Sequence, residues 1–212
     1  SIDIDNQNIT LGNITGSTSG RTLSLDSGSG SITLSNLGAN GTALGTLSLT
    51  GSSLSTSGTN WYTGNISGNL DFTNSQALTI SSGSIDFDDI TMQNNLTINA
   101  SSTIDAATIT GASHNLTLST TASNANITVT TLGSSGNALG TVSITPHGSG
   151  VISTAGAWYT NQATLGATTP SGAFSITTTN DNITLGTLLG TSNVTLTSGS
   201  GTITLGNIGA DG

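Results

Sequence analysis

The sequence predicts an all-β fold, a parallel β-helix (or β-solenoid) with about 19–23 residues per coil, roughly ten coils and essentially no α-helix. Two observations support this prediction. A short apolar motif with strand periodicity recurs along the whole chain, and units of this length bury their apolar face by stacking on copies of themselves. The composition is rich in Thr, Ser, Asn and Gly and contains no Glu or Lys, which disfavours helices.

The recurring motif is an Ile followed by apolar residues two and five positions later. Its seven copies begin at Ile9, Ile32, Ile85, Ile104, Ile127, Ile183 and Ile203. The first two apolar residues alternate with polar ones, as in a strand with one buried face. The third breaks the alternation, so we expect the chain to bend there and glycine to permit the bend. A second alternating motif, such as Leu96-Thr97-Ile98, lies between the copies.

We expect residues 1–212 to form a single continuous β-solenoid with an approximate 95-residue super-repeat, about 27–121 and 122–212. The sequence segment that begins at Ile32 recurs, with similar residues, at Ile127. The beginning of the chain also returns near its end, because Asn-Ile-Thr-Leu-Gly occupies both 8–12 and 182–186. The repeats therefore predict that the chain is part of a longer array.

The charge of the chain excludes several classes of partner. The formal net charge is −9, and Arg21 is the only Lys or Arg. Nucleic acids and anionic membrane surfaces are bound through several basic residues, so neither is an expected partner. No apolar run approaches the roughly 20 residues of a membrane helix, so we expect no membrane insertion. The absence of Cys excludes disulfides and cysteine metal sites.

The densest acidic cluster consists of Asp86, Asp88 and Asp89. Such a cluster could bind Ca²⁺, or act as the carboxylate pair of a β-helical polysaccharide enzyme. It could also be the solvated surface of one coil, which we favour because no basic residue is nearby. His114 and His147 are isolated in loop-like stretches. We therefore predict no catalytic residues, no cofactor, no metal ligands and no enzymatic activity.

Two aromatic pairs are the candidate contact residues. Trp61 and Tyr62 return 97 residues later as Trp158 and Tyr159. If exposed, these four side chains are candidates for contact with glycans or with a neighbouring rod. The alternative, which we favour for the tryptophans, is that they fill a wide point of the core once per super-repeat.

Asparagine is the other residue with two interpretations. Ten Asn-x-Ser/Thr sequons permit glycosylation. The same residues are suited to ladders between coils or to left-handed turns. The sequons begin at Asn8, Asn13, Asn40, Asn65, Asn95, Asn99, Asn115, Asn126, Asn182 and Asn193.

Three segments, residues 28–34, 43–49 and 199–205, resemble the shaft repeats of bacterial filamentous-haemagglutinin-like adhesins, large exoproteins of the two-partner-secretion and autotransporter systems. The resemblance covers nearly the whole chain as a style of repeat. It implies a right-handed β-helical shaft, an extracellular or cell-surface location, and a role in adhesion, biofilms or surface fibres. The Asn-Pro-rich secretion signatures of that family are absent, since neither Pro146 nor Pro170 follows an Asn.

The sequence thus predicts a structural segment of a secreted or cell-surface fibre, a rigid shaft that self-associates end to end or laterally into filaments. One alternative is an adhesin that binds glycans or host cells, which requires exposed aromatic pairs. A second is a polysaccharide-degrading enzyme, which requires converging Asp and basic residues. A third is an ice-binding face, which requires Thr-x-Thr in register on successive coils, and Thr128-Val129-Thr130 is not repeated regularly.

Overall fold

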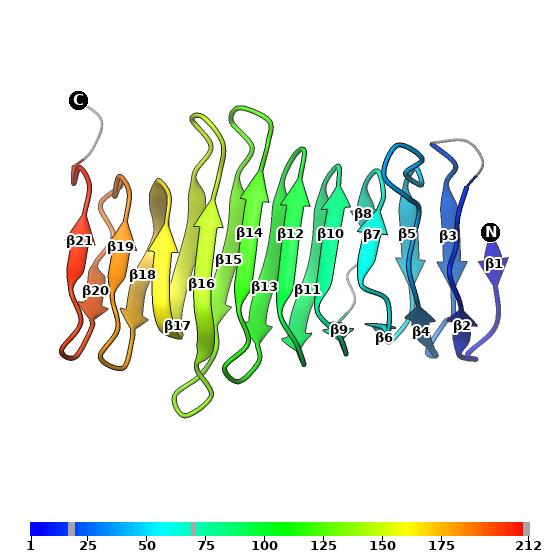
Figure 1. Ribbon diagram of the computed structural model, residues 1–212, viewed down its shortest axis with the longest axis horizontal. Coiled ribbons are helices and arrows are strands. Elements are labelled where there is room, and N and C mark those ends of the chain that lie inside the picture. The colour runs from blue at the N-terminus through cyan, green and yellow to red at the C-terminus, as the bar shows by residue number, and fades with distance from the viewer. Residues whose placement is uncertain (17–19, 69–70, 210–212) are drawn as a thin grey trace.

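The computed structural model describes residues 1–16, 20–68 and 71–209, which form a parallel β-solenoid of about ten coils. Its 21 strands pair in parallel with strands of the neighbouring coils, and the described residues include no helix. Figure 1 shows the coils stacked along one axis, from β1 at one end to β21 at the other. The predicted fold class is confirmed.

Most strands contain two to eight residues, whereas β17 and β18 contain 14 and 10 because they continue around corners of the coil. In chain order the strands are β1 (Ile2–Asp3), β2 (Ile9–Leu11), β3 (Leu23–Asp26), β4 (Ser31–Leu34), β5 (Leu47–Thr50), β6 (Ser53–Thr56), β7 (Asn60–Tyr62), β8 (Ile66–Ser67), β9 (Asp71–Asn74), β10 (Leu78–Ser82), β11 (Ile85–Met92), β12 (Leu96–Ala100), β13 (Ile104–Thr110), β14 (Leu116–Thr120), β15 (Ile127–Leu132), β16 (Leu139–Thr145), β17 (Ile152–Leu165), β18 (Thr168–Thr177), β19 (Ile183–Leu185), β20 (Val194–Thr197) and β21 (Ile203–Leu205).

Three columns of inward-facing side chains run along the rod, and strand register aligns each residue with its equivalent in the next coil. Column 1 contains Leu23, Leu47, Ile66, Ile85, Ile104, Ile127, Ile152, Thr168, Leu188 and Ile208. Column 2 contains Ile9, Ile32, Leu54, Phe72, Ile90, Ile109, Leu132, Trp158, Ile176 and Leu196. Column 3 contains Ile14, Leu37, Trp61, Ile80, Ile98, Leu118, Ile144, Leu165, Leu185 and Leu205.

The columns stay aligned although the coils differ in length. Successive members of a column lie 16 to 26 residues apart, from Ile152 to Thr168 at the short end and from Leu132 to Trp158 at the long end. This range is wider than the predicted 19–23. The additional residues of the longest coil lie in the hairpin 133–138 and the turn 146–150, outside the columns. Figure 1 shows such loops projecting beyond the ends of the strands.

Copies of the sequence motif do not all lie on the same side of the rod. Ile32 lies in column 2, and four coils later that column reaches Ile109. Ile127 is the sequence counterpart of Ile32. From Ile109 the chain first passes column 3 at Leu118 and then reaches column 1 at Ile127. Trp61 and Trp158 shift in the same direction, from column 3 to column 2. The super-repeat therefore spans four and two-thirds coils, and membership of a longer array stays a prediction.

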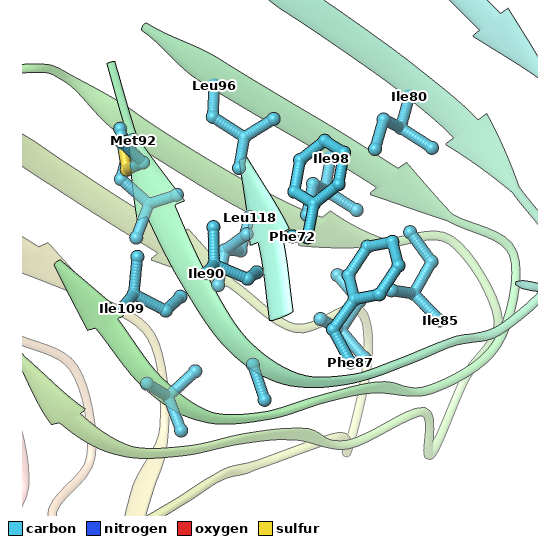
Figure 2. Packing of buried hydrophobic residues seen from close by; sticks show 14 of the residues in the cluster. Phe72, Ile80, Ile85, Phe87, Ile90, Met92, Leu96, Ile98, Ile109 and Leu118 are labelled. Atoms are coloured by element: carbon cyan, nitrogen blue, oxygen red, sulfur yellow. The ribbon is translucent and has the colours of Figure 1, made fainter. Parts of the chain in front are cut away.

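The columns meet in one apolar core, seen in Figure 2. Ile85, Ile90 and Ile98, from columns 1, 2 and 3, point into the same interior and are 0–1% exposed. Nearby, the rings of Phe72 and Phe87 stack with centroids 4.9 Å apart. Complete burial of an aliphatic or Phe side chain stabilises a fold by about 1.5–3 kcal/mol, so each added coil contributes to the stability of the rod.

The strand bends where the sequence breaks the apolar alternation. In β11 the inward-facing Phe87 and Ile90 are separated by two exposed residues, Asp88 and Asp89. Two successive outward side chains carry the chain from column 1 to column 2. The predicted bend is confirmed, but the prediction that glycine permits it is wrong at this corner.

Asparagine side chains link neighbouring coils. Seven of the ten sequon asparagines accept, through Oδ1, a backbone N–H of the following coil at 2.8–3.2 Å. These bonds are exposed to solvent, so each adds only a modest hydrogen bond between successive coils. The seven are Asn8, Asn13, Asn65, Asn95, Asn115, Asn126 and Asn182.

Candidate functional site

Of the four aromatic candidates, the two tryptophans lie in the core. Trp61 and Trp158 are 0% exposed, so neither ring can stack on a sugar or on a neighbouring rod. Their candidacy as glycan or lateral contacts is therefore wrong, and the alternative of core filling is correct. Trp61 packs edge-on against Phe72, with centroids 5.6 Å apart, and its Nε1–H donates to the Ser35 carbonyl at 2.6 Å.

The two tyrosines face outward from the same strands and are half-buried. Tyr62 is paired with Ser81 beside column 3, whereas Tyr159 is paired with Thr177 beside column 2. The two tyrosines therefore lie on different sides of the rod, and their role as contact residues stays a prediction. We call the outer surface of the strands that carry column 3 face 3; it comprises β7, β10, β12, β14, β16, the end of β17, β19 and β21.

An open groove of about 480 Å³ lies at the edge of face 3 beside Tyr62. Four residues of the hairpin 39–43 border it, all but Thr42. Tyr62, Ser81 and Asn99 line it from three successive coils in register. Thr121, one coil further, also lines it. The volume of the groove falls within the range of about 300–1,000 Å³ of ligand pockets, but the groove is open to solvent along its length and does not enclose a ligand.

A straight row of hydroxyl side chains also runs along face 3. Each lies in register with the next, and each is half-buried or exposed. The row consists of Thr79, Thr97, Thr117, Ser143, Thr164, Thr184 and Thr204. The segment Thr128-Val129-Thr130 does not indicate this row. The second alternating motif does, because its central polar residue, such as Thr97 in Leu96-Thr97-Ile98, is a member of the row. The signal was in the sequence, and strand register was needed to read it.

The charged residues of the strands lie on the other sides of the rod. The strands of face 3 carry no charged residue, and the seven strand aspartates all lie on strands of columns 1 and 2. Asp86, Asp88 and Asp89 are exposed, and Asp89 Oδ1 accepts the backbone N–H of Thr108 at 3.0 Å. In the described part of the chain, no three His, Cys, Asp or Glu residues are grouped to hold a metal ion.

Asp105 and Asp86 face outward at paired positions of β13 and β11. Although Asp105 is exposed at the surface, partial desolvation by its neighbours, and secondly the charge of Asp86, raise the pKa of its carboxyl above the ordinary value. The folded state thus holds this proton more tightly than the unfolded state does. The penalty of ionisation is absent below about pH 3.8 and develops as the pH rises through the raised pKa.

Asp105→Asn is therefore expected to stabilise the rod at pH 7 by about 0.5 kcal/mol, discounted for solvent screening. The gain should vanish at pH 3, where the carboxyl is already neutral. Thermal unfolding at both pH values measures it. Asp86→Asn should give a smaller gain, because it removes only the repulsion between the two carboxylates, and the double variant should gain little more than Asp105→Asn alone. Fully additive gains would show that the two carboxylates of this pair do not repel each other.

The fold and its surfaces define this chain as a β-solenoid with one side whose strands carry no charged residue and a groove beside Tyr62. Comparisons with protein-family models, with curated proteins and with solved structures found no match. Of the described residues, none belong to a helix that is long and apolar enough to cross a membrane.

Proposed function

We propose that this chain is a shaft segment of an extracellular structural fibre, with no enzymatic activity. The observation that carries the proposal is the continuity of the three inward columns through ten coils. Each coil is held to the next by parallel backbone hydrogen bonds and by apolar packing, so bending the rod strains many contacts together. The resemblance of residues 28–34 to adhesin shaft repeats also favours a location outside the cell.

The proposed shaft associates with other copies of itself. Ile203, Leu205 and Ile208 are 40%, 36% and 65% exposed, beside β21. A further coil stacked on this end, of the same chain or of a second copy, would pair the backbone groups of the edge and bury these side chains. Lateral contact is favoured on face 3, because its strands lack the charges that repel similar rods.

The length of the particle tests this proposal. Ten coils at about 4.8 Å each give a rod of about 48 Å per copy. Small-angle X-ray scattering of a dilute sample should show an elongated particle of this length, and electron microscopy of a concentrated sample should show filaments. Compact globular particles would refute the shaft. Rods that do not lengthen or bundle with concentration would refute self-association alone.

A further inference from the structure

We propose that the groove beside Tyr62 binds an uncharged polysaccharide chain that lies parallel to the rod axis. This site goes beyond the shaft function, since a shaft needs no ligand. Three features of the groove carry the inference: its direction, the side chains that line it, and its lack of charge.

The groove follows the stacking direction of the coils. It begins at the hairpin 39–43 and continues past Tyr62, Ser81 and Asn99 to Thr121. Each of these lies in the coil that directly follows the previous one. Four steps of about 4.8 Å give a length of about 19 Å. A compact metabolite would occupy only part of this length, whereas a linear oligomer matches it.

The lining suits the two surfaces of a sugar ring. Tyr62 is half-buried and lines the groove, so its aromatic side chain is placed to pack against the C–H face of a sugar. Its hydroxyl makes no hydrogen bond among the described residues. Asn40, at the tip of the hairpin, is exposed. Asn99 Oδ1 accepts the Ser119 hydroxyl at 2.5 Å, which leaves the Asn99 Nδ2 donors for a ligand. An aromatic ring with a few convergent polar groups is the usual composition of a small-molecule site.

Charge selects an uncharged chain over acidic ones. None of the residues that line the groove is acidic or basic, and the whole chain has a net charge of −9. Phosphates, sulfates and uronic acids are bound chiefly through Arg and Lys, which this groove does not supply. Hydroxyl-rich neutral sugars can satisfy its amides and hydroxyls without leaving an ion unpaired.

A glycan array followed by calorimetry tests the proposal. The array carries linear glucan, mannan, galactan and chitin oligomers, with oligogalacturonate and hyaluronan fragments as acidic members. We expect binding to at least one neutral oligomer and none to the acidic ones. Tyr62→Ala and Asn99→Ala should each weaken calorimetric affinity for that oligomer, with Tyr62→Ala losing about tenfold or more.

Tyr159→Ala is the matched control, because Tyr159 also follows a core tryptophan but lies beside column 2. It should leave the affinity unchanged. Circular dichroism and thermal unfolding establish that all three variants fold. Binding to no neutral oligomer, equal binding to acidic ones, or affinity unaffected by Tyr62→Ala in a folded variant would each overturn the site. None of these results would bear on the shaft, which depends on particle length.

Discussion

Trp158→Ala is expected to lower the free energy of unfolding by about 3–5 kcal/mol. The indole is 0% exposed and stands in column 2 between Leu132 and Ile176. It packs edge-on against Phe174, with centroids 5.1 Å apart and an interplanar angle of 85°, and its Nε1–H donates to the Thr130 carbonyl at 3.1 Å. Truncation leaves both a cavity and a carbonyl without its donor. Urea unfolding followed by circular dichroism measures the loss.

Tyr159→Ala provides the comparison, because it removes the adjacent aromatic residue from the outer surface. A half-buried side chain should cost less than about 1 kcal/mol. Since each coil contacts only its neighbours, hydrogen exchange in Trp158→Ala should accelerate first in β15, β17 and β18, which surround the cavity. Equal losses for the two variants would contradict the placement of the indole as a main source of core stability.

The strand pattern of each coil was predictable because it is local. In Ile85-Asp86-Phe87 the alternation of apolar and polar residues determines which side chains point inward, whatever the neighbouring coil contains. The recurrence of such segments every 20 residues or so then predicts stacking. The burial of the tryptophans was also predictable from the sequence, because an aliphatic column accommodates a large apolar ring more readily than it accommodates a charged or polar side chain.

The assignment of each segment to a side of the rod was not predictable. It depends on the summed lengths of all preceding corners, and these corners absorb insertions without moving the columns. The hairpin 133–138 and the turn 146–150 enlarge a coil, yet Leu132 and Trp158 remain paired. The similar segments that begin at Ile32 and Ile127 therefore place their buried side chains on different sides of the rod.

The candidate site was likewise predictable only in part. Tyr62 was identified from the sequence as part of a repeated aromatic pair. The groove beside it was not, because its lining comes from five coils and includes ordinary residues such as Ser81, Asn99 and Thr121. Nothing in the local sequence of these residues distinguishes them from other Ser, Asn and Thr residues of the chain. Only the register of face 3 brings them together.

Gly150→Ala is expected to destabilise the rod by about 3 kcal/mol, at the upper end of the cost of overpacking. A Cβ at this position would lie 2.2 Å from the carbonyl oxygen of Ala125 in the preceding coil. The backbone there cannot move away easily, because the Gly150 N–H closes its turn by donating to the His147 carbonyl at 3.0 Å. A Cβ added at Gly30 or at Gly201 would likewise lie 2.2 Å from a carbonyl oxygen of the preceding coil.

Gly172→Ala separates contact between coils from the general effect of replacing a glycine. Its Cβ would lie 3.5 Å from the Ala155 Cβ, an ordinary van der Waals distance. This variant should be neutral, or more stable by about 0.4–1 kcal/mol because the unfolded chain loses freedom. Urea unfolding of both variants decides between the two causes. If Gly150→Ala costs no more than Gly172→Ala, the coils can separate locally to admit a methyl group, and the close approach at these turns does not set the spacing of the stack.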